Sequence, residues 1–390
     1  MSLSEDDKVL WVNPSFLDYR IPLYGELNKK LNGRFHLLYS KERIPERCHL
    51  KINEVLGDNS HFLEHEKRIK FGESESEFAN NSVSIPVPSG LYGMINKVKP
   101  SHIIAEGFFQ FTPWALAYRL FHRIPLYIAY ERTAHTERNC PLWRRLYRKF
   151  IGKFVTGYIA NGIQTKEYLI SQGVKPECIF TGGMCADSEN LRISSSAMSL
   201  QDRVDFAQSI GLPPVKGLRY IYVGQIIQRK GVDHLLEAWR EYDKTHPDDQ
   251  LLIIGTGEYL EQYRKEYGDM ASVYFLGGID YSIMYKYYAI SDVFVIPTLE
   301  DNWSLVVPEA MACGLPIACS IYNGCHPELV KKDYNGITFD PLSIDSTVKA
   351  LDYFHNQDLS SMGHNSSELE KLFNPEATAQ NIIGMLDECI

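Results

Sequence analysis

The sequence predicts an α/β protein with two Rossmann-like, doubly wound domains. At 390 residues the chain exceeds the size at which one hydrophobic core keeps growing, so two domains are expected. Short apolar runs alternate with amphipathic stretches, which favours parallel sheets covered by helices. A polar break at residues 187–200 interrupts this alternation and predicts the linker. We therefore expect an N-terminal domain over 1–190 and a C-terminal domain over 191–372, with a helix over about 373–390 packing back on the first.

The individual elements follow from the same patterns. Residues 41–80 are polar and poorly periodic, which predicts a long, mobile insertion in the N-terminal half. In that half we expect strands over 9–13, 35–39, 103–105, 126–130 and 157–160, and helices over 20–31, 113–122 and 143–154. In the C-terminal half we expect strands over 220–223, 251–254, 273–276, 293–296 and 317–319, separated by helical segments.

Composition narrows the class of protein. Hydrophobic residues make up 44% of the chain and charged residues 23%, an ordinary globular balance. The net charge of −9 argues against nucleic acid as the main partner. The eight cysteines show no C-x-x-C spacing, which favours reduced thiols and a cytoplasmic location. Without an apolar run of about 18 residues, we expect at most a peripheral contact with the inner face of the plasma membrane.

A first candidate binding loop follows the expected strand over 220–223. It contains Gly224, two adjacent cations at Arg229 and Lys230, and Gly231. Ligands of open α/β sheets bind at the carboxyl edge of the strands, where fixed cations stabilise a diphosphate. Taken alone, the two cations are more typical of an ordinary surface loop.

A second candidate loop covers residues 296–316 and strengthens the interpretation of Arg229 and Lys230 as ligand-binding residues. A buried strand leads into a polar loop, and a helix then begins near Val306 with Pro308 in its first turn. The positive N-terminal end of that helix favours phosphate. Asp301 and Glu309 are carboxylates of the kind that accept hydrogen bonds from ribose and sugar hydroxyls. Singly, each is also explained as a turn residue or as a partner of the helix dipole.

The segment D-N-W-S-L-V-V-P-E-A-M-A-C-G-L-P from Asp301 resembles the donor signature of retaining GT-B glycosyltransferases of family 4, glycosyl transferases group 1. The similarity extends over most of residues 218–340. It implies a GT-B fold, two Rossmann-like domains facing across a cleft, and a nucleotide-sugar donor bound by the C-terminal domain. The implied donor-binding residues are Gly224, Arg229, Lys230, Gly278, Ile279, Asn302, Trp303, Ser304, Leu305 and Glu309.

The resemblance also assigns individual roles. Lys230 and Arg229 hold the diphosphate, Glu309 the ribose, and Asp301 the donor sugar, while the backbone near Gly278 and Ile279 reads the base. His135, directly after the expected strand over 126–130, resembles the family's histidine that faces the donor, which makes His135, Asp301, Lys230 and Arg229 the catalytic candidates.

Four positions depart from the family pattern. Asp301 stands in place of Glu, Gln225 in place of Arg, and Asn302 and Ser304 in place of two glycines. The family's Gly-Gly loop after the first strand is also absent, and Arg20 is the nearest candidate for the acceptor.

Residues 141–154 form a basic amphipathic pattern. Leu142, Leu146, Phe150 and Phe154 are spaced by four, and five cations accompany them. Two interpretations stay open, a helix lying on an anionic membrane and a helix that packs its apolar stripe on the sheet.

The sequence thus predicts a retaining, nucleotide-sugar-dependent hexosyltransferase. The donor is a UDP- or GDP-sugar, the acceptor a saccharide or lipid-linked saccharide of surface polysaccharide or glycoconjugate synthesis, and no permanent cofactor or metal is expected. The alternatives are a non-catalytic nucleotide-sugar-binding protein and a nucleotide-sugar epimerase on the same scaffold.

Overall fold

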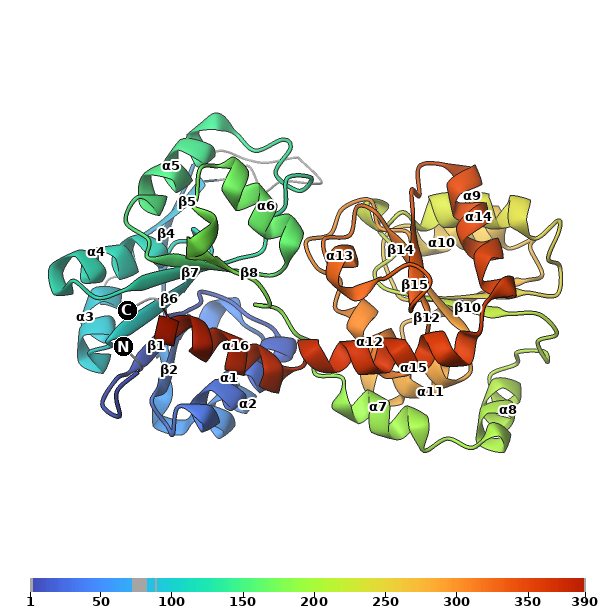
Figure 1. Cartoon of the computed structure of the whole chain (residues 1–390), viewed down its shortest axis with the longest axis horizontal. Coiled ribbons are helices and arrows are strands. Elements are labelled where there is room, and N and C mark those ends of the chain that lie inside the picture. The colour runs from blue at the N-terminus through green and yellow to red at the C-terminus, as the bar shows by residue number, and fades with distance from the viewer. Residues whose placement is uncertain (1–2, 72–82, 88–89, 389–390) are drawn as a thin grey trace. The chain divides into compact units, whose positions relative to one another are not determined.

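A computed structural model describes residues 3–71, 83–87 and 90–388. The chain forms two compact units, the first from residues 1–185 and 375–390 and the second from residues 186–374. Each unit is built on a parallel sheet with flanking helices (Figure 1). The predicted α/β class with two doubly wound sheets is therefore confirmed.

The first unit contains a seven-stranded sheet in the order β3-β2-β1-β6-β7-β8-β9 within the described residues. Its order reverses between β1 and β6, the topological switch point. A separate antiparallel pair joins β4 (Lys67–Phe71) and β5 (Val83–Val87). The sheet strands are β1 (Val9–Val12), β2 (Phe35–Ser40), β3 (Ser60–Leu63), β6 (His102–Glu106), β7 (Leu126–Tyr130), β8 (Gly157–Ala160) and β9 (Ile179–Phe180). The helices are α1 (Ile21–Lys30), α2 (Glu46–Leu56), α3 (Leu91–Val98), α4 (Thr112–His122), α5 (Leu142–Gly152), α6 (Ile163–Ser171) and α16 (Pro375–Glu388).

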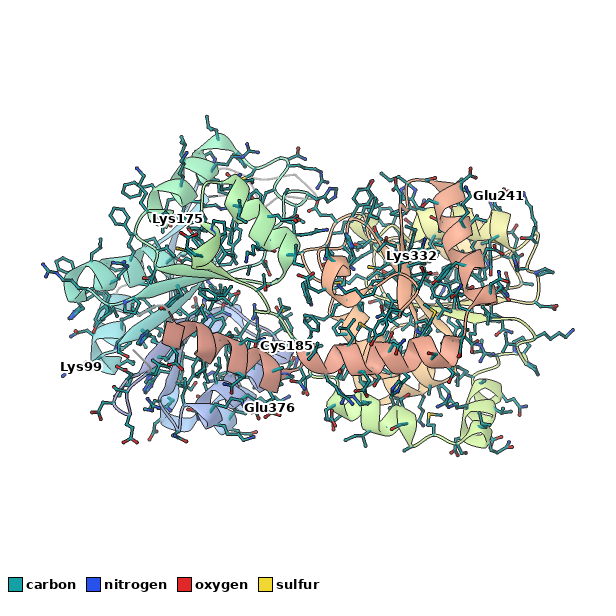
Figure 2. All side chains as sticks on the ribbon, in the orientation of Figure 1. Lys99, Lys175, Cys185, Glu241, Lys332 and Glu376 are labelled. Atoms are coloured by element: carbon teal, nitrogen blue, oxygen red, sulfur yellow. The ribbon has the colours of Figure 1, made fainter. Side chains whose placement is uncertain are left out.

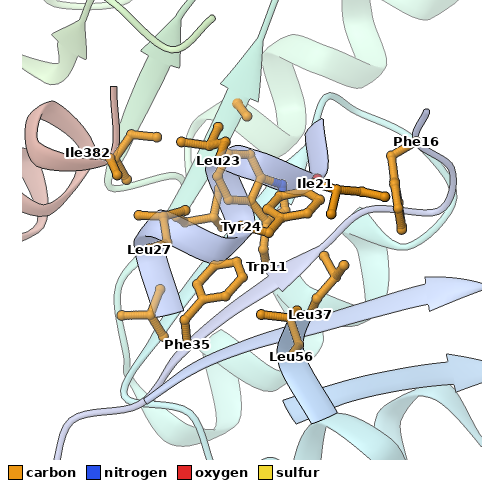
Figure 3. Close-up of a cluster of buried hydrophobic side chains, with 14 of the residues drawn as sticks. Trp11, Phe16, Ile21, Leu23, Tyr24, Leu27, Phe35, Leu37, Leu56 and Ile382 are labelled. Atoms are coloured by element: carbon orange, nitrogen blue, oxygen red, sulfur yellow. The ribbon is translucent and has the colours of Figure 1, made fainter. Parts of the chain in front are cut away.

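Two apolar layers hold this unit together. Successive strand residues point to opposite faces, so Trp11 packs with α1, α2 and α16, whereas Leu10 packs with α3, α4 and α6. Figure 3 shows the first layer, in which Trp11, Tyr24 and Phe35 meet Ile382 of the C-terminal helix. That helix packs against α1 and starts near Glu376, which is labelled in Figure 2.

The predicted insertion over 41–80 is wrong for most of its length. Residues 46–56 form α2, which buries Cys48, Ile52 and Leu56 at a spacing of four, together with His49. Ser60–Leu63 forms a strand of the main sheet. The apolar face of α2 was overlooked because a cysteine and a histidine occupy two of its buried positions. The rest of the stretch, residues 72–80, lies outside the described residues.

The second unit contains a six-stranded parallel sheet in the order β12-β11-β10-β13-β14-β15. Its order reverses between β10 and β13. The strands are β10 (Arg219–Val223), β11 (Gln250–Ile254), β12 (Val273–Gly277), β13 (Val293–Ile296), β14 (Ile317–Ser320) and β15 (Gly336–Phe339). The helices are α7 (Glu189–Ser196), α8 (Leu200–Ser209), α9 (Val232–Tyr242), α10 (Leu260–Tyr267), α11 (Met284–Ala289), α12 (Val306–Ala312), α13 (His326–Leu329), α14 (Ile344–Asp352) and α15 (Leu359–Glu370).

The predicted linker over 187–200 is largely helical. The chain passes from the first unit to the second between Cys185, labelled in Figure 2, and Ala186, and it returns between Asn374 and Pro375. Helix α7 buries Leu191, and its Arg192 pairs with Glu370 of α15 at 2.6 Å. This ion pair and the packing of α7 on α11 and α12 make the polar stretch part of the second unit.

Candidate functional site

Two loops meet at the carboxyl edge of the second sheet, one after β10 and one after β13. These strands are neighbours at the switch point, where open α/β sheets bind ligands. The carbonyl of Arg229 accepts hydrogen bonds from the Leu299 N–H at 2.8 Å and from the Thr298 hydroxyl at 3.1 Å. Main-chain contacts therefore fix the position of the cationic loop relative to the polar loop.

Gly231 allows this close approach. Its φ of +63° lies in the left-handed region, and a Cβ at this position would come within 2.4 Å of the Pro297 carbonyl oxygen. The residue ends the short 3-10 turn Gln228–Lys230 and precedes α9. A side chain here would push the two loops apart.

We expect Gly231→Ala to lower the free energy of unfolding of the second unit by about 2 kcal/mol, from backbone strain and overpacking. Gly211→Ala is the matched control, because Gly211 also has positive φ (+79°) but open space around it. It should cost about 1 kcal/mol. Thermal unfolding of the two variants measures the difference, and equal losses would contradict a role for the contact with Pro297.

Lys230 and Asp301 form the centre of the site. The Lys230 Nζ lies 2.5 Å from Asp301 Oδ2, and their side chains are 12% and 13% exposed. The Ser304 hydroxyl donates to the same oxygen at 2.7 Å, and the Trp303 N–H donates to Asp301 Oδ1 at 3.1 Å. Burial opposes ionisation of Asp301, yet the charge of Lys230 and these hydrogen bonds hold its pKa below the ordinary value. Arg229 adds a second positive charge, with a guanidinium nitrogen 3.8 Å from Asp301 Oδ2.

Three buried polar atoms around this centre have no hydrogen-bond partner among the described residues. They are Asn302 Oδ1, Trp303 Nε1 and Asn323 Nδ2. Buried polar groups are normally paired, because an unpaired one costs about 1–3 kcal/mol of desolvation. All three atoms belong to the loops that follow β13 and β14.

Glu309 lies on α12, eight residues after Asp301, and is held from α11. The Tyr288 hydroxyl donates to Glu309 Oε2 at 3.4 Å. Burial raises the pKa of Glu309 to about 7, against the opposing effect of hydrogen bonds from Tyr288 and Tyr281. The protonation of this carboxyl group therefore changes near neutral pH. When ionised, it is suited to accept hydrogen bonds from hydroxyl groups.

The remaining predicted residues of this unit surround the centre. Gly224 follows β10, and its carbonyl approaches Gly255 so closely that a Cβ on Gly255 would lie 1.8 Å away. Gly278 and Ile279 follow β12, two strands from β10 in the sheet, and Gly278 is exposed. Leu305 is the N-cap residue of α12. All these residues thus lie after strands of the same sheet edge, with Lys230, Arg229, Asp301 and Ser304 in direct contact.

His135 belongs to the first unit and lies in the loop after β7. The hydroxyls of Thr133 and Thr136 brace this loop, each accepting from the other's backbone N–H at 3.0–3.3 Å. An ion pair between Glu137 and Arg148 of α5 anchors its end. The histidine therefore lies in a braced loop at the carboxyl edge of its own sheet.

Arg20 is not available for an acceptor group. It is 4% exposed, pairs with Glu106 at 3.1 Å and donates to the Gly183 carbonyl. The indole of Trp11 donates to the other Glu106 oxygen at 3.0 Å. Burial raises the pKa of Glu106, against the effect of the Arg20 charge and the Trp11 hydrogen bond. This buried network supports the switch point of the first sheet, so the sequence-based assignment of Arg20 to the acceptor is wrong.

Sequence reasoning missed three residues that shape the site. Thr298 and Asn323 are fully buried, and Tyr288 holds Glu309. Asn323 follows β14 and places its side-chain oxygen 3.4 Å from the Ser304 nitrogen. A polar residue shortly after a buried strand was the available signal, since such positions gather at the ligand-binding edge.

Residues 205–368 match the family described as Glycosyl transferases group 1. An uncharacterized glycosyltransferase of Methanocaldococcus jannaschii, MJ1607, is 31% identical over 158 residues, which cover 40% of this chain and 40% of that protein. A GDP-mannose-dependent monoacylated alpha-(1-6)-phosphatidylinositol monomannoside mannosyltransferase of Corynebacterium glutamicum is 33% identical over 114 residues, covering 27% and 30%. The chain thus matches less than half the length of these relatives.

Solved structures extend the similarity of the fold to both units. Anabaena Alr3699/HepE in complex with UDP superposes with a TM-score of 0.75 at 15% identity, covering 98% of this chain and 100% of that one. At this identity the likeness concerns the fold alone, which is GT-B. The match to the group 1 glycosyl transferases falls within the second unit, which holds the whole Lys230 and Asp301 cluster.

Proposed function

We propose that the protein is a retaining glycosyltransferase that moves a hexosyl unit from a UDP- or GDP-sugar to an acceptor hydroxyl. The observation that carries the proposal is the cluster of Lys230, Asp301 and Ser304 beside three unpartnered polar atoms at the switch point. The cluster lies within the region that matches the family. Retention of the anomeric configuration follows from the family resemblance alone.

Each residue has a role in the proposed reaction. The bond between sugar C1 and the diphosphate oxygen breaks with its electron pair on the diphosphate. The acceptor hydroxyl oxygen forms the new bond to C1, and its proton passes to the departing diphosphate. Lys230 and Arg229 stabilise the charge on the departing diphosphate. Asp301 orients the sugar, with the backbone from Asn302 to Leu305, while Glu309 accepts hydrogen bonds from the ribose. His135 is proposed to donate a hydrogen bond to the sugar or β-phosphate.

The acceptor is proposed to be a saccharide or lipid-linked saccharide. The C. glutamicum relative is named for GDP-mannose and a phosphatidylinositol monomannoside, whereas the HepE structure contains UDP. Both nucleotides therefore stay within the proposal. We further propose a cytoplasmic enzyme that works at the inner face of the membrane, with no metal requirement.

A binding and turnover screen tests this function. Purified protein is offered UDP- and GDP-hexoses with a mixed acceptor extract, in EDTA and in Mg²⁺ or Mn²⁺, and products are followed by mass spectrometry. Glu309→Ala removes the proposed ribose acceptor, and Glu261→Ala is its control, since the Glu261 side chain is 79% exposed in the same unit. We expect glycosylated product from wild type and Glu261→Ala, undiminished by EDTA, and a strong loss in Glu309→Ala.

The other outcomes separate the rival functions. Binding without transfer or hydrolysis would identify a nucleotide-sugar-binding protein. Conversion of the donor without any acceptor, detected by NMR of the sugar, would identify an epimerase. If no nucleotide sugar binds, the proposed function is wrong.

A further inference from the structure

Helix α5 of the first unit, labelled in Figure 1, has an apolar stripe whose side chains are largely exposed. Leu142 is 71% exposed, Leu146 57% and Phe150 58%, with Trp143 at 49% beside them. The helix packs on its unit through other residues, chiefly the buried Ile151 and the partly buried Tyr147. The interpretation in which this stripe covers the sheet is therefore wrong for these positions.

The inner side of α5 is firmly attached. Arg148 pairs with Glu137 and lies over the ring of Tyr130, with its guanidinium carbon 5.8 Å from the ring centroid. These contacts fix the rotation of the helix about its axis. Leu146 and Phe150 thus point outward because the contacts of Arg148 hold the opposite face of the helix against its unit.

Exposed cations border the apolar stripe. Arg145 and Lys149 are one helical turn apart on one side, and Lys153 follows at the C-terminal end. None of the three forms an ion pair with another residue in the described part of the chain. Residues 141–154 contain five cations and no acidic residue, against a net charge of −9 for the whole protein. The exposed Arg145, Lys149 and Lys153 therefore place positive charge on this face of a protein whose net charge is negative.

We propose that Leu142, Trp143, Leu146 and Phe150, together with Arg145, Lys149 and Lys153, form a docking surface for an anionic phospholipid bilayer. We call it the α5 surface. Apolar side chains with cations alongside bind such a bilayer by burial at the headgroup boundary and by attraction to the lipid charges. A tryptophan at the border suits the polar interface.

The charge pattern distinguishes this occupant from a second copy of the chain. A symmetric dimer through the α5 surface would bring the same cations face to face, which is unfavourable. Within the described residues no helix is long and apolar enough to cross a membrane, so the contact is a surface contact. The proposal goes beyond the transfer reaction and holds without it.

Co-sedimentation with vesicles tests the α5 surface. Full-length protein is mixed with phosphatidylcholine vesicles, with and without phosphatidylglycerol, at low and high salt. We expect binding to the anionic vesicles, and a loss of at least about tenfold in affinity in Leu146→Glu/Phe150→Glu and in Arg145→Gln/Lys149→Gln/Lys153→Gln. The charge variant should also lose the salt dependence.

Matched controls come from the second unit. Leu200→Glu changes an 81% exposed leucine of α8, and Lys216→Gln/Lys265→Gln/Lys332→Gln removes three exposed cations, of which Lys332 is labelled in Figure 2. Both controls should bind anionic vesicles like wild type. Equal losses in a control and its partner variant would mean that general charge or hydrophobicity drives binding, and would overturn the proposal.

Fluorescence gives an independent readout that does not depend on variants with added charge. Trp143 is half-exposed, whereas Trp11 and Trp239 are fully buried. Insertion should shift the emission to shorter wavelength, and Trp143→Phe should remove this shift. The proposal fails if wild type does not bind anionic vesicles, if Trp143→Phe keeps the full shift, or if the α5 variants dissociate a dimer instead.

Discussion

Lys230→Met is expected to lower kcat/KM for sugar transfer by about 10³-fold, the largest effect of any single change in the site. Lys230 is 12% exposed and follows β10 at the switch point, so its charge acts where little water screens it. Negative charge grows on the diphosphate as the sugar leaves. A fixed cation stabilises that charge more than it stabilises the bound donor, so kcat should fall more than donor affinity.

A second variant separates this role from a structural one. Removing Lys230 also leaves Asp301 as a buried carboxylate without its partner, which is costly by itself. Lys230→Met/Asp301→Asn removes both charges. If unpaired Asp301 destabilises the single variant, the double variant should regain thermal stability, whereas activity should stay lost because neither residue then acts on the donor. A single variant that unfolds at the wild-type temperature and still loses activity would show directly that the loss is not structural. Lys332→Met, an exposed change in the same unit, is the control for general effects.

Glu309→Gln is expected to weaken binding of the nucleotide sugar by about 10²-fold, because charge-assisted hydrogen bonds to ribose hydroxyls are lost. The same variant should abolish the pH dependence of nucleotide-sugar affinity. Burial raises the pKa of Glu309 to about 7, so the free protein carries a neutral carboxyl below that pH. Hydrogen bonds from ribose hydroxyls favour the ionised form of Glu309. Binding of the nucleotide sugar should therefore strengthen as pH rises from 6 to 8.

The expected size of the pH effect follows from the pKa. One unit below it only about a tenth of the carboxyl is ionised, so wild-type affinity at pH 6 should be up to about tenfold weaker than at pH 8. Calorimetry with an intact UDP- or GDP-sugar measures this, since its diphosphate does not titrate in the range. Glu309→Gln should give a flat profile, and Tyr288→Phe, which removes a donor to the carboxylate, should move the midpoint to higher pH. A pH-independent affinity in wild type would contradict the role of Glu309.

Much of the site could be predicted from sequence because its position follows from topology. Lys230 and Asp301 are 71 residues apart, yet each follows a buried strand, and the two strands flank the switch point. Parallel strands end at one edge, so residues after neighbouring strands converge there. The ion pair itself, and the buried atoms of Asn302 and Asn323 that lack partners, depend on side-chain directions that no local pattern contains.

Helices α2 and α5 show that the local sequence pattern does not predict the surroundings of a helix side. The sequence indicated an apolar side for residues 141–154 but not for Glu46–Leu56, and an amphipathic period does not state what an apolar side meets. In α2 the stripe is buried, with Cys48 and His49 among its core positions. In α5 the pairing of Arg148 with Glu137 sets the helix rotation, and the stripe faces outward.

The sequence by itself determined the α/β class, most strands and helices, and the loops that carry the candidate site, because strand and helix periods and the order of elements are local properties. The tertiary structure alone decided that Arg20 is neutralised by Glu106, that Tyr288 holds Glu309, and which side of α5 is free. These outcomes depend on burial and on partners distant in the chain. Such contacts exist only once the sheets are assembled.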